Sequence, residues 1–197
     1  MKGIISIFIS LISFNIANAQ FFEDNKFYST IEMNLGNYIG FDLNLNLVQN
    51  ETFSYKIGYN RHFQKPRSQP ENFSPGFIGL FFLGLGSPYD QIENYQIGIG
   101  KIYQLNKSGT IRANISIGLG YSTIKETVNW VPNDDGIIGT NYSWDYNENY
   151  TVSLIINSKI EFLIKNWAGL TVSPMLLVNT ERIYFGIGLG TMIGYLK

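Results

Sequence analysis

The stretch FDLNLNLV, residues 41–48, alternates large apolar and polar side chains without interruption. One face carries Phe41, Leu43, Leu45 and Leu47, and the other carries Asp42, Asn44 and Asn46. Successive side chains of a β-strand point to opposite faces, so this stretch is predicted to be a strand with one apolar and one polar face. Which face meets the solvent, and whether that solvent is water or lipid, decides the class of function.

Eight segments share this alternation: residues 27–35, 38–48, 52–63, 92–105, 110–122, 150–163, 168–178 and 182–196. No segment after residue 19 has a helical pattern. Many even strands joined by turns predict a sandwich or a barrel. In an up-and-down order, the tight links at 49–51, 106–109 and 164–167 fall at one end. The two long loops, 64–91 and 124–149, fall at the other end, which is typical of a transmembrane barrel.

The glycines indicate which face points inward. Eleven strand glycines fall on the polar face and none on the apolar face: residues 40, 58, 98, 100, 118, 120, 169, 186, 188, 190 and 194. Glycine weakens a strand unless space is tight, and the inside of an eight-stranded barrel has little room. A crowded polar lumen therefore explains the bias better than a solvated outer face.

The aromatic residues of the apolar face gather at two heights. Near the short turns are Phe27, Phe53, Tyr103, Phe162 and Tyr195, with Trp167 in a turn. Near the long loops are Tyr59, Phe63, Tyr95, Tyr121 and Tyr150. Two aromatic girdles around an aliphatic band match the two interfaces of a membrane. We therefore expect Leu43 and Leu45 to face lipid and Asn44 and Asn46 to face the lumen.

With these features the chain resembles the small eight-stranded outer-membrane barrels of the OmpA/OmpX type, the outer membrane protein β-barrel domain group, over residues 20–197. The resemblance implies an all-β, eight-stranded antiparallel up-and-down transmembrane barrel in the cell outer membrane. It also implies contact with outer-membrane lipid and with the barrel-insertion machinery. Such barrels often end on an aromatic residue, whereas here Tyr195 is followed by Leu196 and Lys197.

The first nineteen residues are predicted to be a secretory signal peptide. Lys2 precedes the apolar run 4–14, and ANA at 17–19 is an A-x-A cleavage site, so the mature chain is expected to begin at Gln20. The chain has no cysteine, which excludes disulfides. Charged residues are only 15% of the chain and the formal net charge is −1, which argues against nucleic acid as a partner.

Three features complicate the barrel interpretation. The apolar segment 77–86 and the segment 136–144 could be added strands, which would give ten. Pro174 falls inside the seventh strand, where we expect a bulge. Lys101 falls on the lipid face, close enough to the short-turn end for its amine to reach the interface.

The polar face carries six charged residues, which we predict to form a structural ion network in the lumen: Glu32, Asp42, Lys56, Arg112, Lys159 and Glu161. Buried charges must be paired. The turn at 49–51 predicts that Asn44 lies opposite Lys56 and that Glu32, Asp42 and Lys56 form one cluster. Arg112 and Glu161 are predicted to pair, with Lys159 nearby.

His62, the single histidine, is predicted to lie on the lumen face at the long-loop end of the third strand, as a rim residue without chemistry, because its neighbours in NRHFQ offer no serine. No second histidine or cysteine exists to form a metal site, and no motif calls for a cofactor. The expected function is structural, in the envelope, or interaction with an extracellular partner through loops 64–91 and 124–149. A lipid-modifying outer-membrane enzyme and a soluble lipocalin-like carrier are the alternatives.

Overall fold

The computed structural model describes residues 25–77, 87–133 and 138–196. The predicted signal peptide and residues 78–86 of the apolar segment lie outside this part of the chain. Within it, no helix is long and apolar enough to cross a membrane.

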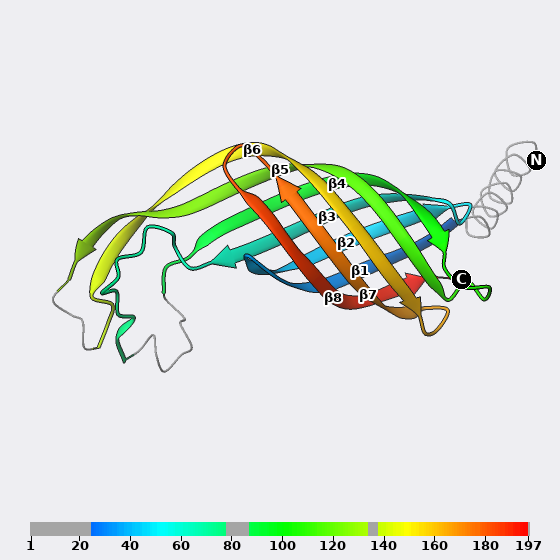
Figure 1. Ribbon diagram of the computed structural model, residues 1–197, viewed down its shortest axis with the longest axis horizontal. Helices are drawn as coiled ribbons and strands as arrows, with labels where there is room; N and C mark the ends of the chain where they lie inside the picture. The colour runs from blue at the N-terminus through cyan, green and yellow to red at the C-terminus, as the bar shows by residue number, and fades with distance from the viewer. Residues whose placement is uncertain (1–24, 78–86, 134–137, 197) are drawn as a thin grey trace, which may run out of the picture.

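Eight antiparallel strands form a closed barrel in sequence order, as predicted (Figure 1). They are β1 (Asn25–Gly36), β2 (Ile39–Gln49), β3 (Phe53–Gln64), β4 (Asp90–Gln104), β5 (Ile111–Pro132), β6 (Tyr142–Leu163), β7 (Ala168–Val178) and β8 (Ile183–Tyr195). The first and last strands close the ring, with pairs that run from Phe27–Tyr195 to Gly36–Gly186. The described residues form eight strands, so the ten-strand alternative finds no support in them.

The two faces of the wall have the orientation that the glycines and aromatics predict. On β2, Leu43 and Leu45 are 41% and 47% exposed, whereas Asp42 and Asn46 are buried. Because a soluble protein rarely exposes a contiguous apolar surface of this size, such an outer wall suits lipid. The soluble carrier alternative requires the opposite orientation and is contradicted.

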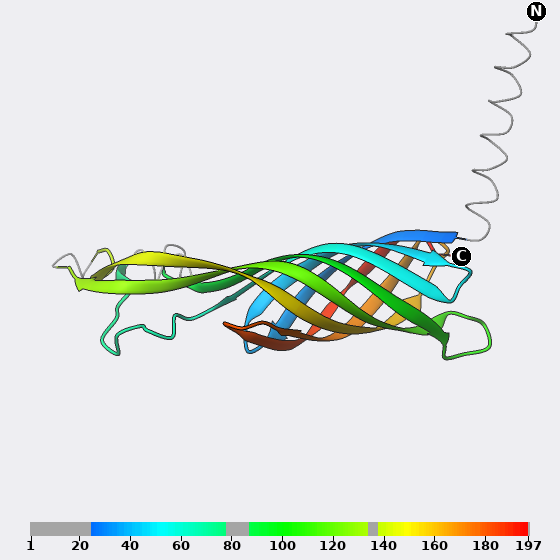
Figure 2. The same cartoon turned by 90° about the horizontal axis from the view of Figure 1, so that it is seen from above.

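Strands β5 and β6 extend far beyond the rest of the barrel (Figures 1 and 2). The β4–β5 pairing ends at Gln91–Lys125, and the β6–β7 pairing includes β6 only from Leu154 onward. Beyond these points the two strands pair only with each other, as far as Pro132–Tyr142, with an irregularity between Val128 and Val131. We call residues 126–132 and 142–153 the protruding ribbon.

The prediction that residues 124–149 form a long loop was therefore wrong. A strand inside the membrane must alternate apolar and polar side chains, whereas a strand beyond it meets water on both faces. The polar residues of the protruding ribbon gave it the composition of a loop. The start of β6 includes residues 142–144, which are thus not part of a separate strand.

The bulge predicted at Pro174 was also wrong. The β6–β7 ladder stops at Asn157–Met175 and resumes at Ile160–Val172 in the same register. Proline has no N–H to donate, and the wall accommodates it by a short gap in the pairing.

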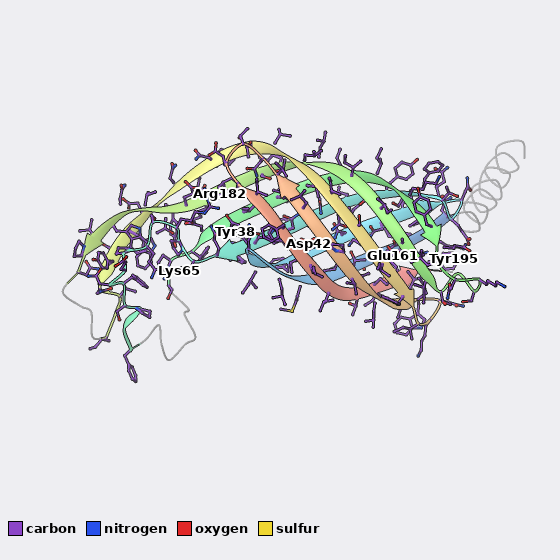
Figure 3. All side chains as sticks on the ribbon, in the orientation of Figure 1. Tyr38, Asp42, Lys65, Glu161, Arg182 and Tyr195 are labelled. Atoms are coloured by element: carbon purple, nitrogen blue, oxygen red, sulfur yellow. The ribbon has the colours of Figure 1, made fainter. Side chains whose placement is uncertain are left out.

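The lumen is filled by three layers of side chains. An outer apolar layer near the long loops consists of Tyr38, Ile92, Ile124, Ile155, Met175, Leu177 and Tyr184. An inner apolar layer near the short turns consists of Tyr28, Val48, Ile102, Leu163, Met192 and Leu196. Polar and charged side chains lie between them, and Tyr38, Asp42 and Glu161 follow one another along the barrel in Figure 3.

Candidate functional site: the lumen network and the protruding ribbon

All six charged residues predicted to face the lumen are buried there: Glu32, Asp42, Lys56, Arg112, Lys159 and Glu161. Two ion pairs form among them. Lys159 Nζ lies 2.7 Å from Glu32 Oε1, and Arg112 Nε lies 2.5 Å from Glu161 Oε2. Lys56 and Asp42 are not paired with each other.

The Arg112–Glu161 pair lies in the half of the lumen nearer the short turns, where the two residues are direct partners in the β5–β6 ladder. Tyr28 donates its hydroxyl to Glu161 Oε1 at 2.7 Å, and Asn114 Nδ2 donates to the same oxygen at 3.3 Å. The guanidinium of Arg112 lies 5.3 Å from the centre of the Tyr28 ring. The sequence predicts this pair because it follows from one cross-strand register.

Glu32 is held by residues from strands that do not neighbour its own. Its Oε1 accepts hydrogen bonds from Lys159 on β6 and from Thr171 and Ser173 on β7, at 2.7 to 2.8 Å. These contacts cross β8, where Gly190 is the ladder partner of Glu32. A Cβ on Gly190 would lie 2.6 Å from Glu32 Cγ, so the missing side chain gives the carboxylate room to cross the strand.

Lys56 does not join Glu32 and Asp42, and the predicted three-residue cluster is wrong in this respect. Its ladder partner is Asn46, whereas Asn44 lies opposite Gly58. The turn that joins β2 and β3 is centred on Glu51, which has a positive φ of 52°. This turn shifts the register of β3 away from the predicted one.

The Lys56 side chain extends in the other direction, over Gly98 of β4. Its Nζ donates to Ser116 Oγ at 3.2 Å and to Asn157 Oδ1 at 2.9 Å. A Cβ on Gly98 would lie 3.6 Å from Lys56 Cε. Both Glu32 and Lys56 thus lie across a glycine of the neighbouring strand, and this arrangement decides their partners.

Asp42 is a buried carboxylate without a donor. It is fully buried opposite Glu32, as the sequence predicts, and neither of its oxygens accepts a hydrogen bond. Its Oδ1 lies 3.7 Å from His62 Nε2. Two acids directly opposite each other in a ladder repel, so this corner of the lumen is electrostatically unfavourable.

His62 faces the lumen, as predicted, but it is fully buried there and is not a residue of an open rim. Its ring stacks on Tyr184 with centroids 3.8 Å apart, and its Nε2 lies 3.3 Å from Asn34 Nδ2. Tyr184 belongs to the outer apolar layer, and so does Ile92, the ladder partner of His62 on β4, so the histidine lies beside this layer. No hydroxyl nucleophile is hydrogen-bonded to His62 among the described residues, and none of their His, Asp and Glu side chains are grouped to hold a metal ion.

The sequence analysis missed the two apolar layers that close the lumen. Their signal is a run in which both faces of a strand are apolar, as in LII at residues 154–156 and MLLV at residues 175–178. Such runs interrupt the alternation at the long-loop end of the barrel, where β6 and β7 begin to pair. They mark positions where an inward side chain closes the barrel.

At the other end of the molecule, aromatic rings pack on the protruding ribbon. Phe73, from the β3–β4 loop, contacts Trp130 and Trp144 edge-on, with centroids 5.6 and 6.3 Å apart. Trp130 also lies 5.8 Å from Trp144 and 6.1 Å from Tyr142. This small apolar cluster lies beyond the barrel and holds the β3–β4 loop against the ribbon.

Hydrogen bonds reinforce that contact. Asn141 Nδ2 donates to the Asn72 carbonyl and Tyr142 OH donates to Asn72 Oδ1, both at 2.8 Å. Nearer the barrel, Ser68 Oγ donates to the Thr127 carbonyl at 2.5 Å. The described part of the β3–β4 loop therefore contacts both strands of the ribbon, at Thr127 and Trp130 on β5 and at Tyr142 and Trp144 near the start of β6.

The β6 side of the ribbon has a free edge. Among residues 25–77, 87–133 and 138–196, no strand pairs with residues 142–153 on the side away from β5, since β7 pairs only from Leu154 onward. The exposed side chains along this stretch include Asp145, Tyr146, Glu148 and Tyr150. Natural sheets usually protect such an edge with lysine, proline or a bulge, and this segment carries no lysine or proline.

No family model and no curated protein matches the chain. Among solved structures, the attachment invasion locus protein Ail of Yersinia pestis is 11% identical, with a TM-score of 0.49 over 87% of this chain and 97% of that chain. The N-terminal β-barrel domain of Pseudomonas aeruginosa OprF is 9% identical, with a TM-score of 0.47 over 87% and 97%. Neisserial surface protein A is 9% identical, with a TM-score of 0.44 over 88% and 96%. The closed eight-stranded architecture follows from the strand pairing of the chain itself, and likeness at this level says nothing of activity.

Proposed function

We propose that this chain is an outer-membrane β-barrel that anchors the protruding ribbon outside the membrane, where the free edge of β6 binds an extended segment of a partner protein. The observation that carries the proposal is the length of β5 and β6 beyond the barrel. A barrel with a purely structural role has no need of a braced ribbon of this length.

The barrel itself is suited to anchoring and not to transport. Its outer wall is apolar, and Tyr59, Tyr95 and Tyr121 are ladder partners that form one aromatic row at the long-loop end. Both ends of the polar lumen are covered by apolar layers. Because the lumen is filled, the chain is proposed to have no pore function.

The free edge supports binding by strand addition, in which main-chain hydrogen bonds supply affinity. On the β5 side the ribbon carries Pro132, the irregularity at Val128 and the brace from the β3–β4 loop. On the β6 side, residues 145–153 contain no proline and no irregularity in the pairing, and the loop touches this stretch through the ring of Tyr89, which lies 6.2 Å from that of Tyr146. A partner strand is therefore expected on β6, next to Tyr146 and Tyr150.

Location and orientation can be tested by cysteine labelling, because the chain has no cysteine of its own. We expect Asn133→Cys, beyond the end of β5, to react with a membrane-impermeant maleimide on intact cells. Asn50→Cys, in the β2–β3 turn, should react only after the outer membrane is permeabilised. Labelling of both variants in intact cells, or of neither, would contradict the proposed topology.

The interaction can be tested in a deletion strain that is complemented with edge variants and assayed for adhesion and cell–cell aggregation. Asn147→Lys places a protecting lysine on the β6 edge and is expected to abolish the gain over the deletion strain. Val131→Lys, at an exposed position on the β5 side, is the matched control and should behave as wild type. Equal activity of the two variants would show that the β6 edge is not the binding surface.

A catalytic role is not proposed for His62, because His62 and Asp42 are fully buried in the lumen. A lipid substrate would have to displace the side chains packed around them before reaching them. The His62→Ala variant is accordingly expected to leave envelope lipid composition unchanged, as judged by mass spectrometry of extracted lipids.

A further inference from the structure

Lys101 is a charged residue on the lipid-facing wall. It belongs neither to the lumen network nor to the protruding ribbon. It is exposed on the outward face of β4, three residues before the end of the strand. Its ladder partners are Phe53 on β3 and Ile115 on β5. Because Phe53 belongs to the aromatic girdle near the short turns, Lys101 lies at the level of the lipid headgroups on that side.

The amine of Lys101 has no acidic partner. No ion pair of the described residues includes it. Its Nζ lies 5.3 Å from the centre of the Tyr103 ring, which is an attractive but neutral contact. The positive charge is therefore available to an anion at the membrane interface.

A groove in the outer wall begins at Lys101 and runs toward the middle of the barrel. The lower hollow, of about 470 Å³, is lined by Phe53, Tyr55, Ile99, Lys101, Ile115 and Ile117. A second hollow of about 530 Å³ continues it and shares Tyr55, Ile99 and Ile117 with it. The second hollow ends beyond Ile97 and Leu119, and its floor includes the main chain of Gly98 and Gly118.

The groove covers a large part of one leaflet. From Lys101 to Ile97, β4 extends about 13 Å along the strand, which is about 10 Å along the membrane normal at the usual strand tilt. The hydrocarbon core of a bilayer is about 30 Å thick, so the groove spans roughly two-thirds of one leaflet. A lipid whose phosphate lies at Lys101 would have an acyl chain long enough to follow the whole groove.

We propose that Lys101 and this groove form a binding site for an anionic phospholipid in the leaflet on the short-turn side. The phosphate and its net negative charge are held by the Lys101 amine, and one acyl chain lies between Tyr55, Ile99 and Ile117. The inference rests on the proposed membrane insertion of the barrel. It adds a preference for one class of lipid, which a merely apolar wall would not have.

The test uses the folded barrel in phosphatidylcholine vesicles that contain chain-spin-labelled phosphatidylglycerol or chain-spin-labelled phosphatidylcholine. Both lipids carry a phosphate, but phosphatidylcholine also carries its own cation. Electron paramagnetic resonance measures the fraction of each lipid whose motion is restricted by the protein. We expect wild type to favour phosphatidylglycerol about fivefold, which is the effect of one interfacial lysine, and Lys101→Gln to lose this preference.

Lys165→Gln is the matched control. Lys165 lies at the same end of the barrel, with its Nζ 5.6 Å from the centre of the Trp167 ring, but it lines neither hollow of the groove. This variant should keep the preference. A wild-type protein without a preference, or an equal loss in both lysine variants, would overturn the proposed site.

The groove is tested separately from the charge. Ile117→Trp should fill it and reduce the restricted fraction of phosphatidylglycerol, whereas Ile187→Trp on the outward face of β8 should not. Equal restriction in both tryptophan variants would show that no acyl chain occupies the groove.

Heat-modifiable migration of every variant on gels reports folding, so that loss of the lipid preference with normal folding rejects this site alone. A wild-type chain that does not insert into vesicles would reject the proposed function as well.

Discussion

Glu32 on β1 and Lys159 on β6 form an ion pair of 2.7 Å across two intervening strands. Because β1 and β6 are not neighbouring strands, the two residues are not partners in any β-ladder. The pair exists because β8 carries glycines where a side chain would stand between them. It is the contact on which the central layer of the lumen depends.

Removing the lysine should leave a buried carboxylate without its counter-charge. We expect Lys159→Met to lower the free energy of unfolding by about 3–5 kcal/mol, measured by urea titration of the folded barrel in lipid vesicles. The double variant Glu32→Gln/Lys159→Met is the control, since it removes both charges. It should recover a large part of the loss, and a double variant as unstable as Lys159→Met would contradict the role of the pair.

Lys56→Met should lower the free energy of unfolding by less than Lys159→Met does. The predicted cluster would have made Lys56 the partner of Glu32 and Asp42, but its amine binds only Ser116 and Asn157. Its loss leaves two neutral oxygens short of a donor, at a cost of about 1–3 kcal/mol. The same urea titration compares the two lysines, and a loss as large as that of Lys159→Met would favour the original cluster.

Asp42→Asn should stabilise the barrel. Asp42 has no donor and faces Glu32, so an amide at this position removes a like-charge repulsion and an unpaired buried charge. We expect a gain of about 1–3 kcal/mol. Glu161→Gln provides the contrast, because that carboxylate is paired with Arg112 and its loss should destabilise. A destabilised Asp42→Asn variant would show that Asp42 has a partner that this geometry does not supply.

Gly190→Ala and Gly98→Ala form a matched test of the crowded lumen. A Cβ on Gly190 would overlap the carbonyl oxygen of Ile31, whereas the nearest atom to a Cβ on Gly98 would be 3.2 Å away. We expect Gly190→Ala to lower the free energy of unfolding by about 1–3 kcal/mol, with a much smaller change for Gly98→Ala. The temperature at which each variant unfolds, seen as a change in its migration on gels, would show which variant is less stable. Equal unfolding temperatures would mean that the barrel wall accommodates a Cβ at either position.

The faces of the strands could be predicted from the sequence because the two-residue period depends on backbone geometry alone. The Arg112–Glu161 pair could be predicted for a related reason, since direct ladder partners require only one register. The partners of Glu32 and Lys56 could not, because both long side chains cross a neighbouring strand. Their direction depends on where glycines on other strands leave room.

The protruding ribbon could not be predicted for a different reason. Lipid imposes the alternation between Ile115 and Leu119, and water on both sides of the wall removes it beyond Lys125. The turn centred on Glu51 is a third reason why part of the structure could not be predicted from the sequence. A shift of one residue in a short turn moves every pair of the following ladder, and residue types alone do not fix it.

The Glu32–Lys159 pair also has a consequence for assembly. It joins the first strand to the sixth, so it can form only once β8 has met β1 and the ring is complete. An incompletely closed sheet would hold Glu32 on its β1 margin and Lys159 on β6, two strands in from the other margin, and neither charge would have its partner. Intermediates in which β1 and β8 are not yet paired are therefore unstable. Pairing of these two strands and formation of the ion pair inside the barrel become a single cooperative event.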